Sequence, residues 1–436
     1  MHKEVSSTTT VEPATQLQGA LRVPGDKSIS HRYALLAALA DGTTTIRNYS
    51  MGADCLSTLS CLQALGVSVE SIPRSQNTGM KVSITGQGLG TLTPSKYPID
   101  TDNSGTTMRL LAGILANYPF TSILTGDSSL QKRPMRRIIQ PLEQMGATLN
   151  STNGYPPLVV RGAPLTGIDY APLIASAQVK SSVLLAGLHA RGTTQINEPI
   201  ATRDHTERAL SAFGAQTQNT DGAFSVTGGT PLNPLNLTVP GDPSSAAFLI
   251  VAASIIPGSD LLVEGVGLNP TRTAYIDVLR HAGADIQTEL DGTNASEPYG
   301  NIRVRSRPLN NLTITAEQVP SVIDELPALG ALAAHGCVVD VSGAAELRNK
   351  ESDRIAAFAK GLRDLGADVT EREDGFVAFR QNELKGGTAD AAGDHRLAMA
   401  FAIAALAGRE PSTITGSDSV AISFPGFFSV LDMLRQ

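Results

Sequence analysis

The sequence of 436 residues has no tryptophan, only 4% aromatic residues and only three cysteines. It also lacks an excess of positive charge, because 34 lysines and arginines stand against 41 acidic residues. Nucleic acids attract cations and stack on aromatic rings, so these shortages argue against a nucleic acid partner. Cys55, Cys61 and Cys337 are odd in number and show no CxxC spacing, which argues against a zinc or redox site and fits a reducing compartment.

Long hydrophobic runs are missing as well. The longest, at residues 246–256 and 397–407, are well short of the roughly 20 residues that a membrane span needs, and residues 1–16 do not resemble a signal peptide. We therefore expect a cytoplasmic protein without a membrane partner, and a disordered leader over residues 1–16. With 41% hydrophobic and 17% charged residues the remainder is globular, and its length predicts two or three domains.

A short pattern recurs along the chain: an apolar helical stretch, a glycine, and then an alternating strand. The five copies are CLQALGVSVE, PLEQMGATLN, ALSAFGAQTQ, VLRHAGADIQ and GLRDLGADVT, with glycines at Gly66, Gly146, Gly214, Gly283 and Gly366. Each glycine follows the last apolar helical residue, where a left-handed residue ends a helix. The pattern thus predicts a helix that runs into a strand.

A second pattern, a polar start followed by a helix rich in small apolar residues, occurs six times. The copies begin at PGDKSISHR, TDNSGTTMR, SAQVKSS, PGDPSSA, VIDELPALG and GDHRLAM. Combined, the two patterns predict six βαβαββ repeats of about 65 to 85 residues, in which the helices of the second pattern are buried. The expected fold is α/β (α+β), with a first domain at residues 26–240 and a second domain formed by residues 17–25 and 241–436, three repeats in each.

Cations gather at the helix starts and in the loops before the second helices. They are Lys27, Arg32, Arg109, Lys132, Arg133, Arg136, Arg137, Lys180, Arg203, Arg348, Lys350, Arg354 and Arg396. Any one of them could be an ordinary surface residue. Because the positive end of the helix dipole lies at the helix N-terminus, acids are usual there, and repeated cations predict a bound anion.

PGDKSISHR (24–32) is the densest of these segments. Asp26 can cap a helix, while Lys27, Ser28 and Arg32 lie on its first turns. A P-loop is excluded, because its glycine must directly precede the lysine and Asp26 intervenes here.

Other segments leave structural alternatives open. Asp324 could be a helix cap, and Glu351 with Arg354 could be a surface ion pair. The seven histidines, His395 among them, show no ligand spacing, so we expect no metal and no cofactor.

These motifs together resemble the 5-enolpyruvylshikimate 3-phosphate synthases. The resemblance covers residues from about Gly19 to the C-terminus and rests on PGDKSISHR, DNSGTTMR, GDSSLQKRPM, SAQVKS, RDHTE, ELRNKESDR, DHRLAM and SFPGFF. It implies an enolpyruvyl transferase with two domains of three βαβαββ units, a site in the cleft between them, and no metal or cofactor. The implied reaction joins phosphoenolpyruvate to the 5-hydroxyl of shikimate 3-phosphate with release of phosphate. We expect a monomer, whose domains close on the substrates.

The resemblance also implies roles for individual residues. The implied substrate-binding set is Lys27, Ser28, Arg32, Asn103, Gly105, Arg133, Ser176, Ala177, Gln178, Arg203, Asp324, Lys350, Arg354 and Arg396. Asp324 is the candidate base, while Lys27 and Glu351 are candidate proton donors or shuttles. Gly105 implies inhibition by glyphosate in competition with phosphoenolpyruvate.

Two positions depart from the usual family pattern. Ile422 stands where many members have lysine, and Leu110 stands where many have proline after Arg109. The first departure removes one phosphate contact, and the second changes the packing behind Gly105.

Three alternatives carry related features. UDP-N-acetylglucosamine enolpyruvyl transferases have a reactive cysteine in the loop where this chain has Ser128 and Ser129. A non-catalytic anion-binding module would not need Asp324 and Glu351. RNA terminal phosphate cyclases share the repeat, but the few aromatic and basic residues count against an RNA substrate.

Overall fold

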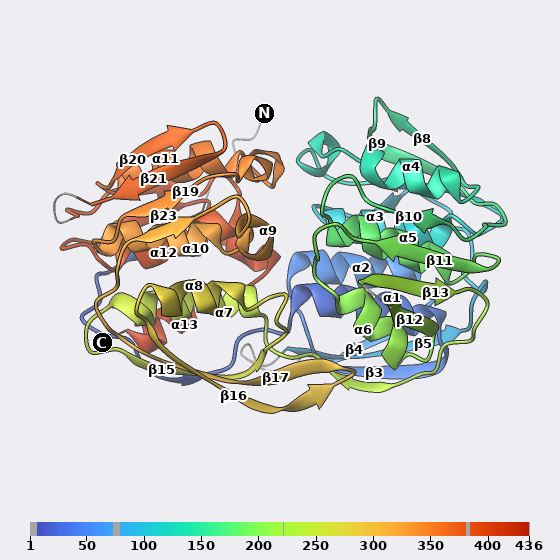
Figure 1. Cartoon of the computed structure of the whole chain (residues 1–436), viewed down its shortest axis with the longest axis horizontal. Helices are drawn as coiled ribbons and strands as arrows, with labels where there is room; N and C mark the ends of the chain where they lie inside the picture. The colour runs from blue at the N-terminus through green and yellow to red at the C-terminus, as the bar shows by residue number, and fades with distance from the viewer. Residues whose placement is uncertain (1–6, 73–78, 221, 381–383, 436) are drawn as a thin grey trace. The chain divides into compact units, whose positions relative to one another are not determined.

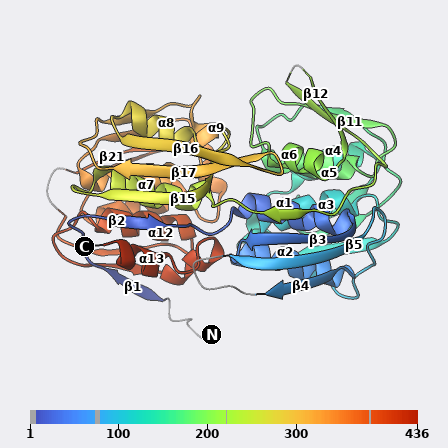
Figure 2. The same ribbon diagram turned by 90° about the horizontal axis from the view of Figure 1, so that it is seen from below.

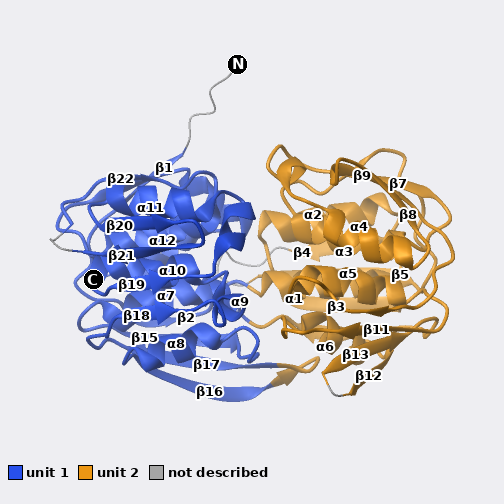
Figure 3. Cartoon of the chain, turned by 45° about the horizontal axis from the view of Figure 1, so that its top comes forward, with its two compact units in different colours: residues 1–24, 241–292, 298–436 blue, residues 25–240, 293–297 orange. Residues whose placement is uncertain are grey.

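The computed structural model describes residues 7–72, 79–220, 222–380 and 384–435. The chain forms two compact units (Figure 3): unit 1 comprises residues 1–24, 241–292 and 298–436, and unit 2 comprises residues 25–240 and 293–297. Each unit has its own cluster of buried apolar side chains. The division differs from the expected one at Gly25 and at residues 293–297, which belong to unit 2.

Unit 2 holds three repeats. Its helices are α1 (Lys27–Leu39), α2 (Ala53–Ala64), α3 (Gly105–Leu115), α4 (Arg136–Gln144), α5 (Ala177–Gly187), α6 (His205–Ala212) and the 3-10 helix η1 (Leu130–Lys132). Its strands are β3 (Asp41–Tyr49), β4 (Ser68–Ile72), β5 (Met80–Gln87), β6 (Ile99–Asp100), β7 (Thr121–Thr125), β8 (Thr148–Thr152), β9 (Tyr155–Arg161), β10 (Asp169–Tyr170), β11 (Thr193–Asn197), β12 (Gln216–Thr220), β13 (Ala223–Thr227) and β14 (Asn236–Thr238). They form sheets ordered β14-β3-β5-β4, β6-β7-β9-β8 and β10-β11-β13-β12.

Unit 1 holds the remaining elements (Figure 1). Its helices are α7 (Pro243–Ile255), α8 (Ala274–His281), α9 (Val319–Val322), α10 (Leu326–Gly330), α11 (Arg354–Asp364), α12 (His395–Ala405), α13 (Phe427–Leu434) and the 3-10 helices η2 (Ala331–His335), η3 (Ala345–Asn349) and η4 (Ser417–Ile422). Its strands are β1 (Thr8–Val11), β2 (Gln18–Leu21), β15 (Asp260–Gly267), β16 (Asp285–Asn294), β17 (Glu297–Arg305), β18 (Leu312–Ile314), β19 (Val339–Val341), β20 (Asp368–Arg372), β21 (Gly375–Phe379), β22 (Thr388–Asp390) and β23 (Ser412–Thr415). The sheet orders are β16-β17-β15-β2, β18-β19-β21-β20 and β1-β23-β22.

The βαβαββ repeat is confirmed most directly in the sheet β6-β7-β9-β8. Strand β6 pairs in parallel with β7 across α3, and β8 and β9 then pair antiparallel. The predicted ends of the second helices are also confirmed: each of the five glycines has a positive φ, from 84° at Gly214 to 115° at Gly146. Such angles favour glycine because it has no Cβ, so these residues stop each helix and turn the chain into the next strand.

Two strands are exchanged where the chain passes between the units. Strand β2, which precedes α1 in sequence, pairs with β15 of unit 1, while β14, which precedes α7, pairs with β3 of unit 2. Figure 2 shows β2 beside β15, with β17 and β16 beyond. The strand that precedes α1 thus belongs to the sheet of the fourth repeat, and the strand that precedes α7 belongs to the sheet of the first repeat.

Three expectations are wrong in detail. The helix expected from VIDELPALGALAAHG is broken into α10 and η2 after the short α9, and prolines open α9 and α10. The sixth repeat ends in η4 and α13 instead of two strands. Its third strand is β1, which pairs antiparallel with β23, so the supposed leader is ordered over these residues.

The small-residue helices are buried, as predicted. Every residue of α7 except Ile255 is buried, as are all eleven residues of α12. Between α3 and α5 the backbones meet at Gly113, where an added Cβ would lie 2.2 Å from the carbonyl oxygen of Ser182. Such close packing requires glycine and fixes the starts of the two helices relative to each other. Among the described residues, no helix has the length and apolar character to cross a membrane.

Candidate active site

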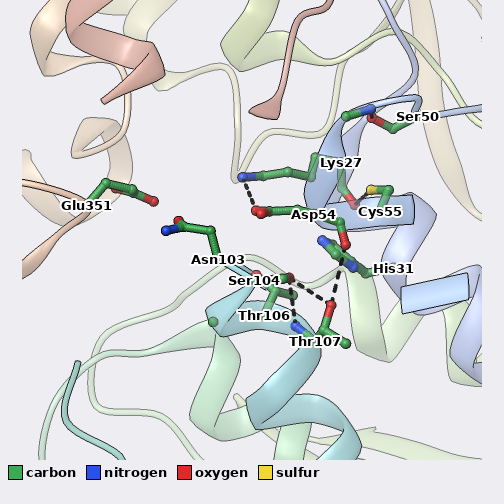
Figure 4. Close-up of polar contacts among 12 residues, drawn as sticks. Lys27, His31, Ser50, Asp54, Cys55, Asn103, Ser104, Thr106, Thr107 and Glu351 are labelled. Atoms are coloured by element: carbon green, nitrogen blue, oxygen red, sulfur yellow. Dashed lines mark hydrogen bonds and ion pairs between the residues drawn. The ribbon is translucent and has the colours of Figure 1, made fainter. Parts of the chain in front are cut away.

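The first cluster of candidate residues lies at the start of α1 in unit 2. The carboxylate of Asp26 caps the helix by accepting a hydrogen bond of 2.9 Å from the backbone of Ile29. Lys27, the first helical residue, places its Nζ 2.9 Å from Oδ2 of Asp54 at the start of α2 (Figure 4). Sequence reasoning missed Asp54, because an acid in the first turn of a helix is common and needs no functional reason.

A chain of buried polar side chains links the starts of α1, α2 and α3 (Figure 4). Nδ1 of His31 lies 2.6 Å from Oγ1 of Thr58, which lies 2.7 Å from Oγ1 of Thr107. Thr107 in turn contacts Oγ of Ser104, the cap of α3, at 2.7 Å. Burial, with the positive charges of Lys27 and Arg32, holds the pKa of His31 well below its ordinary value, so the imidazole stays neutral.

Two pairs of an arginine and an amide side chain lie near the start of α3. Arg133 donates to the side-chain oxygen of Asn103 at 2.7 Å. Arg109 donates to the side-chain oxygen of Gln178 at 2.7 Å. A Cβ added at Gly105 would lie 2.7 Å from Nη1 of Arg109. The absence of a side chain at Gly105 therefore leaves room for the guanidinium of Arg109.

At the start of α5, Ser176 caps the helix by accepting from the backbone of Val179 at 3.4 Å, and Ala177 is the first helical residue. Arg32 reaches this helix from α1 and is only 3% exposed. Its Nη1 donates to the carbonyl oxygen of Ser28 at 2.8 Å. Burial lowers the pKa of Arg32 to about 10, with a further contribution in the same direction from the charge of Arg203. The guanidinium is therefore still charged at neutral pH.

The second cluster lies in unit 1 around the carboxylate of Asp324. Its oxygens lie 3.9 Å from Nζ of Lys350, 3.8 Å from Nη1 of Arg354 and 3.8 Å from Nη2 of Arg396. Arg396 also donates to the backbone carbonyl of Asp324 at 2.6 Å. The residue at the start of α10 is Glu325, so Asp324 does not cap that helix. Burial lowers the pKa of Lys350 below its ordinary value, against the opposing effect of Asp324.

Arg354 links this cluster to two further carboxylates. Its guanidinium bonds to Glu351 and, at 2.7 Å, to Oδ2 of Asp394. The side chain of Arg354 is only 2% exposed, so its pairing with Glu351 is not the surface ion pair that the spacing alone allowed. Burial opposes its charge, but Asp394 and Glu351 outweigh that effect and raise its pKa. Asp394 also caps α12 through its side chain, and sequence reasoning did not single it out.

Not every predicted cation belongs to these clusters. Lys132 and Arg136 are exposed. Lys180 is buried between the carboxylates of Glu198 and Glu207, at 2.6 Å from each, so its charge is already neutralised. The part of the chain that the structure describes contains no group of three or more histidine, cysteine or acidic side chains arranged to hold a metal ion.

The fold and these clusters are those of an enolpyruvyl transferase with six repeats, and comparisons identify the family. The family model for EPSP synthase (3-phosphoshikimate 1-carboxyvinyltransferase) matches residues 11–431. A 3-phosphoshikimate 1-carboxyvinyltransferase of Halorhodospira halophila is 49% identical over 97% of this chain and 95% of its own length. One of Bacillus velezensis is 46% identical over 98% of this chain and 99% of its own length.

Solved structures agree. An EPSP synthase from Acinetobacter baumannii matches with a TM-score of 0.86 and 42% identity, over 98% of both chains. The enolpyruvyl transferase NikO of Streptomyces tendae, at 17% identity and a TM-score of 0.77, shares the fold. The chain belongs to the EPSP synthase family, and the resemblance seen in its motifs is confirmed.

Proposed function

We infer that this chain is a 3-phosphoshikimate 1-carboxyvinyltransferase. It transfers the enolpyruvyl group of phosphoenolpyruvate to the 5-hydroxyl of shikimate 3-phosphate and releases phosphate. Membership of the family supports the reaction, and the observation that supports it within this chain is the carboxylate of Asp324 beside Lys350, Arg354 and Arg396. One potential base beside three cations suits the deprotonation of a hydroxyl next to anionic substrates.

We propose that the residues of both clusters act in this reaction. The substrate oxygen forms a bond to C2 of the enolpyruvyl group while C3 gains a proton, and the C2–O bond to phosphate then breaks as C3 loses a proton. Asp324 takes the hydroxyl proton, and Lys27 and Glu351 deliver and remove the proton at C3. In this assignment the cations of both units neutralise the phosphates and carboxylates of the two substrates, whose like charges repel.

The loop that differs from UDP-N-acetylglucosamine enolpyruvyl transferases supports the choice of acceptor. It carries Ser128 and Ser129, and the chain's three cysteines are all buried with free thiols. Burial also raises the pKa of Cys61 to about 12, so this thiol stays protonated at neutral pH. A reactive cysteine is exposed and has a lowered pKa, and none of the three fits that description.

Release of phosphate from phosphoenolpyruvate tests the function. We expect release with shikimate 3-phosphate and none with UDP-N-acetylglucosamine, and the reverse preference would overturn the assignment. The same assay after incubation with EDTA tests the expected independence of metal: loss of activity that zinc or magnesium restores would contradict it. We also propose that the protein is cytoplasmic and monomeric. Light scattering after size exclusion chromatography measures its mass and tests whether it is a monomer.

A further inference from the structure

Unit 2 buries two cations whose partners come from the motif RDHTE (203–207). Arg32 on α1 is 3% exposed and Lys180 on α5 is 1% exposed. Thr206 bonds to Arg32, and the next residue, Glu207, bonds to Lys180. A buried charge costs several kcal/mol unless it is compensated, and the motif compensates these two charges in different ways.

Lys180 is compensated by negative charge. Glu198 and Glu207 each place a carboxylate oxygen 2.6 Å from its Nζ. Glu198 also accepts a hydrogen bond of 3.3 Å from the backbone of Thr202, one residue before the motif. Lys180 therefore joins α5 to the segment that carries the motif, and its charge is cancelled locally.

The hydrogen bonds of Arg32 go to neutral groups, while the carboxylates of Glu207 and Asp26 stabilise its charge without bonding to it. Its Nε donates to Oγ1 of Thr206 at 2.6 Å, and its Nη2 donates to Oγ of Ser181 at 2.7 Å. Both hydroxyl groups are buried, and their oxygens lie 2.6 Å apart. Two adjacent oxygens thus face one edge of the guanidinium, as the oxygens of a carboxylate would, but without a negative charge.

The direction of each hydrogen bond follows from the donors. A guanidinium can only donate, so both hydroxyl oxygens accept from Arg32. Ser181 donates its own proton to the carbonyl oxygen of Ala177 at 2.6 Å, so the bond between the hydroxyl groups runs from Thr206 to Ser181. With the bond from Nη1 to Ser28, three of the five N–H groups of Arg32 are used, which leaves one on each terminal nitrogen.

We propose that Thr206 and Ser181 are positioning residues, which fix the guanidinium of Arg32 while leaving its charge and two N–H groups for an anionic substrate group. This inference rests on the proposed function, in which Arg32 binds substrate. Because the two hydroxyl groups and the carbonyl oxygen of Ser28 that hold Arg32 are neutral, no bonded carboxylate cancels its charge, and an anion that reaches the remaining N–H pair binds more strongly than it would beside Lys180. The same motif therefore serves structure through Glu207 and binding through Thr206.

Substitution of Thr206 in the full chain tests the proposal. Thr206→Val keeps the size of the side chain and removes the hydroxyl group, and Thr206→Ser keeps the hydroxyl group. We expect the KM for shikimate 3-phosphate to rise about tenfold in Thr206→Val, the scale of one hydrogen bond to a charged group, with a smaller change in kcat. Thr206→Ser should remain within about twofold of the wild type, since the bond to Arg32 is retained.

A matched control is available on β11 of the same unit. Thr194 is fully buried, and within the described residues its hydroxyl group has no hydrogen-bond partner. Thr194→Val makes the same exchange without touching Arg32, so its KM should not change. An equal rise in Thr194→Val and Thr206→Val would mean that the effect is general to the fold and would overturn the proposal, as would an unchanged KM in Thr206→Val.

Binding of shikimate 3-phosphate by calorimetry separates a positioning role from a purely structural one. If Thr206 acts through Arg32, Thr206→Val should weaken binding in the wild type and have no further effect in Arg32→Ala. Additive losses would contradict the proposal. Should Thr206→Val not fold, Thr206→Asp provides the test, because it keeps an acceptor for Arg32 but cancels its charge: binding about as tight as in the wild type would overturn the proposal. A wild-type protein that neither binds nor converts shikimate 3-phosphate would refute the proposed function itself.

Discussion

One helix start occurs in two copies, one in each unit, and the copies differ in the residues that follow the capping aspartate. Helix α1 begins within PGDKSISH (24–31) and α7 within PGDPSSAA (240–247), and in both the aspartate caps the helix through its side chain. In α1 the cap is followed by Lys27 and Ser28, which are partly exposed, whereas in α7 it is followed by the buried Pro243 and Ser244.

The copy in unit 1 is closed by an internal ion pair. Arg272 bonds to Asp242 at 3.2 Å and to the hydroxyl oxygen of Ser244 at 2.7 Å, and Ser244 donates to Glu325. The repeat therefore preserves the backbone and the cap, while the residues after the cap differ: those of α1 are proposed to bind substrate, and those of α7 are held by the internal ion pair. In unit 1 the candidate catalytic residue is instead Asp324, the neighbour in sequence of the buried Glu325.

The largest effect is expected at that position. If the chemistry of unit 1 lies at Asp324, Asp324→Ala should lower kcat by about 100- to 10,000-fold, the range for a general base, and weaken phosphoenolpyruvate binding far less. Steady-state kinetics with both substrates measures this. A kcat within about threefold of the wild type would make Asp324 a structural residue.

The second test replaces the cation beside each of the two helix starts with methionine. Arg272→Met should lower the free energy of unfolding by about 3 to 5 kcal/mol, because it removes the buried cation that pairs with Asp242. Lys27→Met should cost less stability, since the side chain of Lys27 is 16% exposed and that of Arg272 only 2%, but should reduce kcat by about 100-fold or more. Denaturant unfolding and kinetics are measured on both variants. Equal loss of stability in the two would contradict the division of roles.

The third test concerns Gly105 at the start of α3, a helix of unit 2 that does not begin with the PGD motif. We expect glyphosate to inhibit in competition with phosphoenolpyruvate, and Gly105→Ala to weaken glyphosate more than phosphoenolpyruvate by about 1 to 3 kcal/mol, the scale of overpacking. The added methyl group displaces the guanidinium of Arg109, which lies 2.7 Å from it, and narrows the space for the longer molecule. Inhibition constants and KM values for both proteins decide this. Equal losses would show that Gly105 does not discriminate.

The smallest expected effect is a pH dependence of stability that α1 contributes and α7 does not. His31 on α1 corresponds to Ala247 on α7, so only α1 carries a buried neutral imidazole at this position. Below about pH 6.5 the unfolded chain binds a proton that folded His31 does not, so stability falls with decreasing pH by up to about 1.4 kcal/mol per unit. His31→Gln should reduce this slope between pH 6.5 and 5. The free energy of unfolding is measured across that range for both proteins. An unchanged dependence on pH in His31→Gln would show that His31 is not responsible.

Local chemistry made much of this fold predictable. The five glycines that end the second helices could be read from the sequence because a positive φ and an apolar periodicity are local properties. The residues proposed for the site could be named from the sequence because they occur in short motifs. The division of the helix expected from VIDELPALGALAAHG was missed because Pro327, which opens α10, stands in a stretch (326–334) that is otherwise apolar or small.

Strand pairs and ion pairs between residues far apart in the chain could not be predicted from the sequence. Strand β1 looks like part of a polar leader, and its partner lies beyond residue 411. Lys180 looked like an anion-binding cation, because nothing local shows that Glu198 and Glu207 neutralise it. Asp54 was missed for the same reason, since only the folded chain brings it to Lys27.

The exchange of leading strands sets an order on synthesis at the ribosome. Residues 25–240 of unit 2 leave the ribosome before any partner of β1 or β2 exists, since β2 pairs with residues 260–263 and β1 with residues 412–415. Domains fold as units during translation, so unit 2 can build its core while the two earliest strands of unit 1 wait with open edges. Strands β1 and β2 are thus made before residues 25–240 but find their partners only after them, and the nascent chain must keep their edges from pairing elsewhere until unit 1 is complete.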